Sequence, residues 1–406
     1  MNSARSMLDR SHKLIFCIAI ILGISVRLYF ALSQIGVETW GHFVFYRTIK
    51  EGHILDFYRF NNDSPGVKYV YGPVWMGTMI QYSLFTDFRT LSDPYFWLFS
   101  RMPIIIADVL CFLLIYLIGG RSNRALIASI AYFLNPFTIL VGSDRASFDS
   151  IGCCLLLLSL LLITKESCLP GGLTLALAML TKPYFYFAWP ILFFTMVRTR
   201  RQEAIKIAGS SILFFCLISA PFFLAAPSWY LNVALVTIKW SSPNPVLLEK
   251  SASGLWYLVF QERWKIAHFL GLSKLSADFY TLWIPVTIIG LVTVCTYLYL
   301  NPSESVYKVF PISACLFCLL ASPINLPFLL FPSLGTHLMI ATEKKQWLTY
   351  ILLSPLILIG VNGLFGEVFD LSGLAVAASI VFWLSLELIA TLWQVGRSPR
   401  ILRLRH

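Results

Sequence analysis

The chain has 406 residues, of which 58% are hydrophobic and only 13% are charged. This composition excludes an ordinary soluble protein, because a soluble domain of this size with so many hydrophobic residues would expose a large apolar surface. The formal net charge of +11 is concentrated in short connections between apolar segments and in the C-terminal tail. That distribution is typical of the cytoplasmic side of a membrane protein and argues against nucleic acid as a partner.

Apolar segments long enough to cross a bilayer as helices recur along the whole chain, without the alternation of an outer-membrane barrel. The sequence therefore predicts an all-α, polytopic membrane bundle of about twelve transmembrane helices, with both ends in the cytoplasm. The first span lacks the cleavage site of a signal peptide, so we expect it to be retained. The predicted spans start near residues 14, 96, 124, 148, 169, 184, 205, 279, 307, 324, 346 and 371.

Two stretches decide the number of spans. Residues 169–197 are too long for one upright helix and are interrupted at Lys182 and Pro183, so they are interpreted as two short helices that meet at the outer surface. Residues 71–86 contain glycine, proline and polar residues. An interfacial helix is favoured there over a thirteenth span, because another crossing would move the later basic connections to the outer side.

The predicted spans divide the chain into three regions. Residues 1–226 form a transmembrane module that contains a first long outer loop, residues 35–95. Residues 227–278 form a second long outer loop, and residues 279–406 supply the C-terminal helices and a basic tail. Both outer loops are rich in Trp, Tyr, Pro and charged residues, so chemistry is expected on the outer or lumenal face.

Nearly all of the nine cysteines lie within apolar runs and are expected to be buried. Cys315 and Cys318 have the spacing of a metal or redox site. They have no second ligand pair and no basic residue nearby to lower a thiol pKa, so a metal role is disfavoured.

Three acidic residues of the first outer loop are candidate catalytic groups. Glu38 follows the first span directly, where partial burial raises a carboxyl pKa toward the range of a general base. The alternative is an interfacial carboxylate paired with Arg47 or Lys50. Asp56 and Asp63 are secondary candidates in the same loop.

Aromatic residues of the outer loops are candidates for contact with a sugar or an acceptor. Aromatic rings stack on sugar faces, and they also populate the membrane–water interface of any membrane protein. The candidates are Trp40, Tyr58 and Tyr71 in the first loop and Trp240 in the second.

Charged residues inside or beside apolar helices are the next candidates. Asp149 lies at the start of a strongly apolar helix, and an intramembrane acid is a functional candidate by default. An ion pair with Arg145, four residues earlier, is the alternative. Lys182 lies at the outer ends of two short helices, where binding a phosphate or snorkelling to lipid headgroups would explain a cation. Arg27 lies in the first predicted span, and Arg101 and Asp108 lie on one face of the second. Internal pairing and helix positioning are favoured over catalysis for these three residues.

Four stretches together resemble the GT-C superfamily of membrane glycosyltransferases that use polyprenyl-phosphate sugars. They are Glu38 followed by "GHILDFY" and "YVYGPVW", then "RMPIIIADVLCFLLIYLIG", "NPFTILVGSDRASFDSIGCCLLLLSLLLI" and "LPGGLTLALAMLTKPYFYFAWPILF". The resemblance covers residues 14 to about 197. Two departures stand out: the family usually has Asp where this chain has Glu38, and Gly-Gln where this chain has Ala146 and Ser147.

The resemblance implies a mannosyltransferase-like enzyme in the plasma membrane or endoplasmic reticulum, with its active site on the outer or lumenal face. The donor would be a polyprenyl-phosphate sugar and the acceptor a lipid, a glycan or a protein. Glu38 would deprotonate the acceptor hydroxyl in one inverting displacement. Lys182 is the first choice for holding the donor phosphate, with Arg145 and Lys239 as weaker candidates. No cofactor is certain, and dependence on a divalent metal stays open.

Three other functions remain open on the sequence. A polytopic lipid-linked sugar transporter or flippase would place polar groups near mid-membrane in two corresponding halves, whereas here they gather at one face. An oligosaccharide ligase is a closer enzyme alternative. A noncatalytic assembly subunit predicts no turnover by the purified chain.

Overall fold

Every element in the described part of this computed structural model is a helix. The described residues are 2–33, 35–36, 38–63, 71–231, 283–302, 305–320, 326–342, 354–365 and 373–397. The N-terminal half contains α1 Asn2–Ser33, α2 Thr39–Lys50, α3 Phe57–Asp63, α4 Pro73–Phe85, α5 Pro94–Ile118, α6 Asn123–Phe133, α7 Pro136–Ile139, the π-helical η1 Leu140–Asp144, α8 Asp149–Thr164, α9 Cys168–Met179, the 3-10 helix η2 Pro183–Phe187, α10 Ala188–Met196 and α11 Arg201–Ala225. The C-terminal half contains α16 Trp283–Leu300, η4 Val306–Lys308, α17 Val309–Leu320, η5 Leu326–Leu329, α18 Leu330–Thr342, α20 Ser354–Phe365 and α21 Gly373–Arg397.

The all-helical prediction is confirmed, and several helices are compatible with a membrane protein. Within the described ranges, four helices are long and apolar enough to cross a bilayer: Lys13–Ser33, Pro94–Ile118, Arg201–Ala225 and Ser379–Gly396. A fifth candidate is the pair formed by α6 with α7 and η1, which is bent by 48°. The other apolar helices have 10–17 residues, so the number of about twelve spans stays a prediction.

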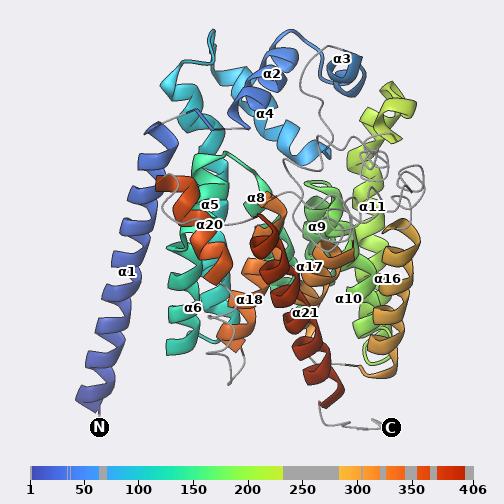
Figure 1. Cartoon of the computed structure of the whole chain (residues 1–406). Helices are drawn as coiled ribbons and strands as arrows, with labels where there is room; N and C mark the ends of the chain where they lie inside the picture. The colour runs from blue at the N-terminus through green and yellow to red at the C-terminus, as the bar shows by residue number, and fades with distance from the viewer. Residues whose placement is uncertain are drawn as a thin grey trace, which may run out of the picture.

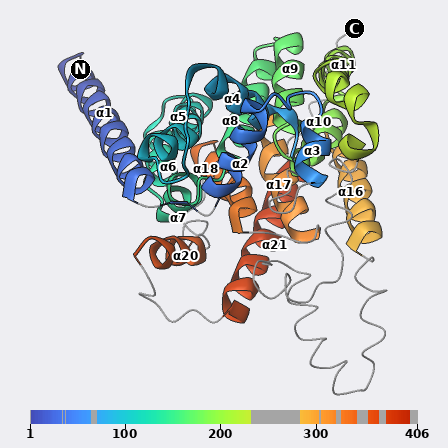
Figure 2. The ribbon, with the colours of Figure 1, turned by 90° about the horizontal axis from the view of Figure 1, so that it is seen from above.

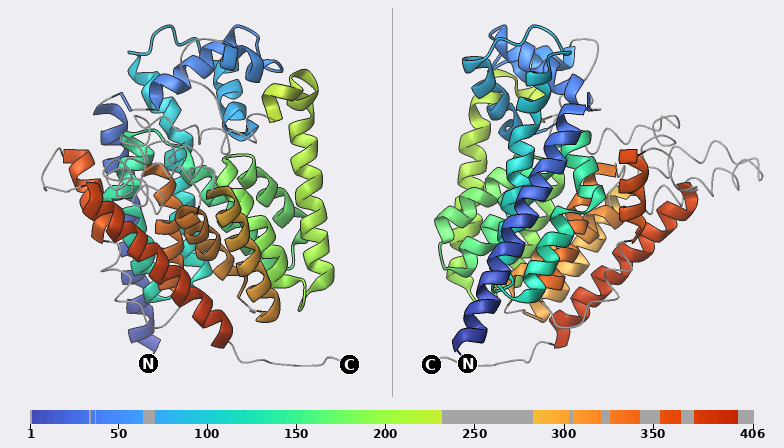
Figure 3. Two further views of the ribbon diagram at one scale, coloured as in Figure 1. Left: turned by 45° about the vertical axis from the view of Figure 1, so that its right-hand side comes forward. Right: turned by 90° about the vertical axis from the view of Figure 1, so that its left-hand side faces the viewer.

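The helices of the first predicted outer loop, α2, α3 and α4, gather at one end of the bundle (Figure 1). Seen from above, they lie over the central helices, between α5 and α11 (Figure 2). Residues 71–86, for which an interfacial helix was favoured, contain α4, which has 13 residues and packs against α2. The first residues of α1 and the last residues of α21 lie at the opposite end (Figure 3).

A close backbone approach fixes this cap of three helices to the bundle. A Cβ atom at Gly72 would collide with the carbonyl oxygen of Leu180, so only glycine fits at this contact. The backbone N–H of Val74 also donates to the Leu180 carbonyl at 3.4 Å. The start of α4 is therefore held against the break between α9 and η2.

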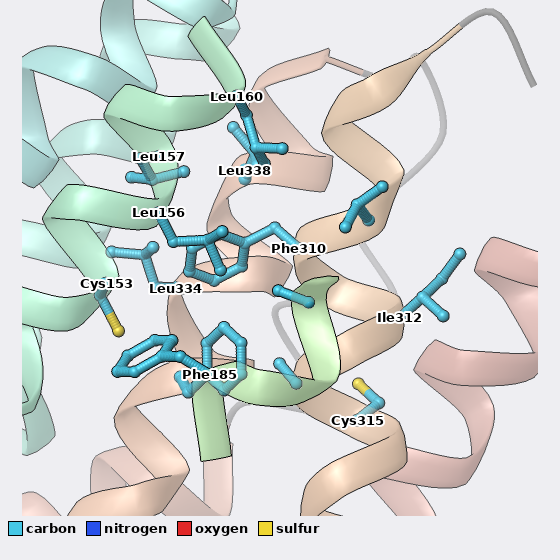
Figure 4. Packing of buried hydrophobic residues seen from close by; sticks show 14 of the residues in the cluster. Cys153, Leu156, Leu157, Leu160, Phe185, Phe310, Ile312, Cys315, Leu334 and Leu338 are labelled. Atoms are coloured by element: carbon cyan, nitrogen blue, oxygen red, sulfur yellow. The ribbon is translucent and has the colours of Figure 1, made fainter. Parts of the chain in front are cut away.

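The largest apolar cluster joins the central helices around α8. Figure 4 shows side chains of α8, η2, α17 and α18 interdigitating, among them Leu156, Leu160, Phe185, Phe310 and Leu334. All five are fully buried. Helices in a bilayer associate largely through such van der Waals packing, so this cluster fixes η2 against the helix that begins at Asp149.

Charged residues inside the spans pair between helices. Arg27 of α1 and Asp108 of α5 are fully buried and form an ion pair of 3.0 Å, and the Tyr132 hydroxyl donates to Asp108 at 2.9 Å. Arg101 donates instead to the carbonyl oxygens of Ala31 and Asp144. The expected internal pairing is therefore confirmed for Asp108, although its partner is Arg27 of a distant helix and not Arg101 on the same helical face.

Candidate active site

Glu38 lies between the end of α1 and the start of α2, directly before Thr39. Its backbone N–H donates to the Arg145 carbonyl at 3.0 Å, which ties the start of α2 to the turn before α8. Its side chain is half-buried. The cations expected as alternative partners bind elsewhere: Arg47 pairs with Glu51 at 3.3 Å, and Lys50 donates to the carbonyl of Thr86 at 2.8 Å. The sequence-based alternative of a simple interfacial ion pair therefore does not apply to Glu38.

Asp149 and Lys182 form a fully buried ion pair between the start of α8 and the residue before η2. The Lys182 Nζ atom lies 2.6 Å from Asp149 Oδ2, and the Tyr184 hydroxyl donates to the other carboxylate oxygen. The Ser147 hydroxyl donates to Asp149 Oδ2 at 2.5 Å. Asp149 is also the first residue of a helix, where the helix dipole favours a negative charge.

The turn that precedes Asp149 has an unusual backbone. The π-helical turn η1 ends at Asp144, and Ala146 has a φ of +63° although it is not glycine. Both features are enriched at functional sites. Ala146 occupies the place where the resembled family has Gly, a residue that adopts this conformation freely. The left-handed residue also separates Arg145 from α8, so the expected i,i+4 pair between Arg145 and Asp149 does not form.

Ser147 connects the two acids. Its hydroxyl lies within hydrogen-bonding reach of the Glu38 carboxylate as well as of Asp149. Burial raises the pKa of Glu38; Lys182 opposes this effect, and the charge of Asp149 adds to it. Glu38, Asp149 and Lys182 come from three distant parts of the sequence, and the fold brings them together. The half-buried carboxylate of Glu38, with its raised pKa and an ion pair beside it, is suited to accept a proton.

Aromatic rings surround the ammonium group of Lys182. Its Nζ atom lies 4.5 Å from the ring centre of Phe148, 4.9 Å from that of Tyr71 and 5.6 Å from that of Phe328. Burial raises the pKa of the half-buried Tyr71 to about 12, so its hydroxyl stays protonated and remains a donor at neutral pH. Lys182 is only 1% exposed, whereas Arg145 is half-buried and more accessible to a ligand.

The other sequence candidates lie in different surroundings. Trp40 is 46% exposed, next to Glu38 on α2. Tyr58 is fully buried, and its hydroxyl already donates to the Tyr71 carbonyl at 3.1 Å, so it holds the cap together. Asp56 lies beside His53 and pairs with Arg59, both at 3.3 Å. Three candidates fall outside what the structure describes: Lys239, Trp240 and the side chain of Asp63.

Ser147, Tyr184 and His42 were not singled out from the sequence. Ser147 lies two residues before Asp149, and Tyr184 lies two residues after Lys182. Closeness in the sequence to a predicted site residue could have pointed to both. His42 lies in the first predicted outer loop, yet it is 1% exposed and lies on α2, one helical turn after Glu38. Its place at i+4 from Glu38 becomes meaningful only once residues 39–50 are known to be helical.

Metal ligands do not cluster in the described residues: no three His, Cys, Asp or Glu side chains there are placed to hold an ion. Cys315 and Cys318 are buried in α17, as expected of small apolar residues. The arrangement is a half-buried carboxylate next to a shielded ion pair, with the half-buried Arg145 at the same turn. Comparison with protein-family models and with curated proteins finds no match for this chain.

Proposed function

We propose that this chain is an integral-membrane glycosyltransferase of about twelve spans, with its active site at the end capped by α2, α3 and α4. It would move a hexose, mannose-type in preference, from a polyprenyl phosphate to a hydroxyl of a lipid, a glycan or a protein. The observation that carries the proposal is the half-buried Glu38 carboxylate beside Ser147, Asp149 and Lys182. The resemblance of residues 14–197 to the GT-C superfamily supports the same function.

The chemistry is one inverting displacement. Glu38 accepts the proton of the acceptor hydroxyl while that oxygen forms a bond to the anomeric carbon. The bond between the anomeric carbon and the phosphate oxygen breaks, and the phosphate leaves with the bonding electron pair. Glu38 then returns its proton to water. The leaving phosphate is already ionised, so it needs a nearby positive charge more than a proton.

Arg145 and Lys182 have different electrostatic roles in this proposal. Asp149 already balances the charge of Lys182 at 2.6 Å, so the Lys182 ammonium offers little net attraction to a phosphate. Arg145 is half-buried at the same turn, and a guanidinium can bind a phosphate in bidentate fashion. We therefore assign the phosphate contact to Arg145 first. Lys182 would hold Asp149 and Tyr71 in place, and Lys239 stays a weaker candidate.

The position of the polar side chains favours an enzyme over a transporter. The backbone bond from Glu38 to Arg145 joins the start of α2 to the turn before α8, where Asp149 pairs with Lys182. Because α2 belongs to the helical cap at one end of the bundle (Figure 1), this position suits chemistry at a membrane surface. An oligosaccharide ligase would use the same base and leaving group and differs only in its donor. A panel of donors separates these two enzymes.

The test is transfer by the purified chain in lipid vesicles. The donors are radiolabelled polyprenyl phosphates that carry mannose, glucose or an oligosaccharide, offered together with a membrane lipid extract. We expect the label to move from one monosaccharide donor to an acceptor, with inversion at the anomeric carbon. Transfer of the oligosaccharide alone would favour the ligase. Absence of transfer from every donor, with labelled donor crossing the vesicle membrane, would overturn the proposal in favour of a flippase.

A further inference from the structure

Three polar side chains near Glu38 along the chain and in the cap are buried without a hydrogen-bond partner among the described residues. Both ring nitrogens of His42, the hydroxyl of Thr39 and the indole nitrogen of Trp75 make no hydrogen bond within the described part of the chain. Each side chain is at most 1% exposed. A buried polar group without a partner costs about 1–3 kcal/mol, so three such residues together indicate a place built to meet a polar ligand.

The three side chains belong to one spot. Thr39 and His42 lie three residues apart on α2, and the His42 ring lies 4.6 Å from the Trp75 ring of α4. Trp75 stacks on Phe148 at 4.9 Å, and Phe148 lies 4.5 Å from the Lys182 Nζ atom. The ring of Phe148 alone therefore separates Trp75 from the Asp149–Lys182 pair.

The chemistry of the spot selects a neutral, hydroxyl-rich ligand. Burial, with the charges of Arg101 and Lys182, lowers the pKa of His42 to about 3, so the imidazole is neutral near pH 7. A neutral imidazole donates from one nitrogen and accepts at the other, which matches a sugar hydroxyl. Trp75 adds a donor, and its ring is a surface on which a sugar can pack.

We infer that His42 and Trp75, assisted by Thr39, bind the hydroxyl groups of the sugar that is transferred. This inference rests on the proposed function, and it adds specificity-determining residues to it. The sugar reaches the spot past the half-buried Glu38 and Tyr71, so the Trp75 and Phe148 rings have to shift when it binds. The anomeric carbon then lies beside Glu38, with the phosphate on the side of Arg145.

The test compares the binding of two lipids to the full-length protein in nanodiscs. One is a short-chain polyprenyl-phosphate mannose, and the other is the same polyprenyl phosphate without its sugar. We expect the wild type to bind the mannosylated lipid more tightly. His42→Phe keeps an aromatic ring against Trp75 but removes both nitrogens, and should weaken binding of the mannosylated lipid about tenfold while binding of the bare lipid is unchanged. Trp75→Phe removes one donor and should cost about three- to fivefold.

Two further variants control for folding. His42→Gln keeps a donor and an acceptor and should recover part of the affinity for the mannosylated lipid. Trp383→Phe removes another buried indole nitrogen without a partner, in α21, and should change neither affinity.

Two outcomes would count against the inference in different ways. If His42→Phe and Trp75→Phe bind the mannosylated lipid as the wild type does, the sugar contact is wrong while the proposed function stands. If the wild type binds neither lipid, the proposed function fails and the inference fails with it.

Discussion

At Glu38, the neighbouring charges of Lys182 and Asp149 act on the carboxylate in opposite directions. Burial raises the Glu38 pKa most, Lys182 lowers it, and Asp149 raises it. A general base works only when ionised, so transfer should be lost as the pH falls through this raised pKa, at a pH above the ordinary value of 4.5. A pH profile of kcat/KM for the wild type has an acidic limb, the range in which activity falls with pH, and the position of this limb reports the pKa of Glu38.

The variant Asp149→Asn should move the acidic limb to lower pH. It removes the negative neighbour and leaves Lys182 charged, and both effects favour the ionised form of Glu38. Asp87→Asn is the matched control, because Asp87 is an exposed partner of Arg89 and should leave the limb unchanged. A limb that moves to higher pH in Asp149→Asn would contradict the electrostatic coupling of the two acids.

Ala146 holds the backbone shape of the site. Its φ of +63° costs a non-glycine residue about 1–2 kcal/mol, and its side chain is fully buried. Ala146→Gly should therefore fold normally and keep its transfer activity. Ala146→Val should lose about 2 kcal/mol or more of unfolding free energy, because a β-branched residue disfavours this region. Unfolding in an SDS titration measures both, and equal stability of the two variants would refute the strain argument.

The pair of Asp149 and Lys182 joins α8 to η2 and fixes the site between elements. Lys182→Met leaves a buried carboxylate without its charge partner and should lower the free energy of unfolding by about 3–5 kcal/mol. The double variant with Asp149→Asn removes both charges and should recover much of that loss. SDS unfolding of the wild type, both single variants and the double variant completes the cycle.

The exposed pair Arg47–Glu51 gives the matched control for that cycle. Both side chains are about half exposed, at 48% and 49%, so Arg47→Met and Glu51→Gln should each change the stability by less than about 1 kcal/mol. Additive effects of Lys182→Met and Asp149→Asn would show that the buried pair contributes nothing as a pair.

The sequence predicted helical secondary structure well, but it predicted poorly which charged side chains pair with one another. The break at Lys182 and Pro183 lies between α9 and η2, and the proline that starts η2 explains it. The pairing of Arg145 with Asp149, weighed as an alternative, and that of Arg101 with Asp108 both rested on helical spacing along one segment. Ala146, with its left-handed backbone, interrupts the helix between Arg145 and Asp149. Asp108 pairs with Arg27 instead of Arg101, because α1 brings Arg27 to it from a distant part of the chain. Helical periodicity does not reveal contacts between distant helices.

In the whole molecule, the start of α1 and the end of α21 lie at the opposite end of the bundle from the cap of α2, α3 and α4, and this arrangement predicts a topology. Gly52, after α2, and Gly120, after α5, have φ values of +99° and +70° and open space around them, so both tolerate a short epitope tag. A tag at Gly52 should bind antibody on intact cells or sealed lumenal-side-out vesicles. A tag at Gly120 should bind only after permeabilisation. The reverse pattern would place the proposed site in the cytoplasm.

At this scale, composition was enough to predict an all-helical protein, and the residues of 71–86 were enough to predict a helix within the first long loop. It was not enough to find the spot around His42, because that spot exists only where α2 meets α4 and Phe148. Glu38, Asp149 and Lys182 were expected on one face from topology alone, and they lie together. Their roles in transfer stay a prediction.

The most direct test of the central claim is the variant Glu38→Gln. It keeps the shape of the side chain and removes its basicity, so kcat for sugar transfer should fall by about 10²–10⁴-fold while the affinity for the donor stays within about twofold. Glu51→Gln, at the other end of α2, is the control and should transfer at the wild-type rate. Undiminished transfer by Glu38→Gln would contradict the account, because no acceptor proton would then pass to Glu38.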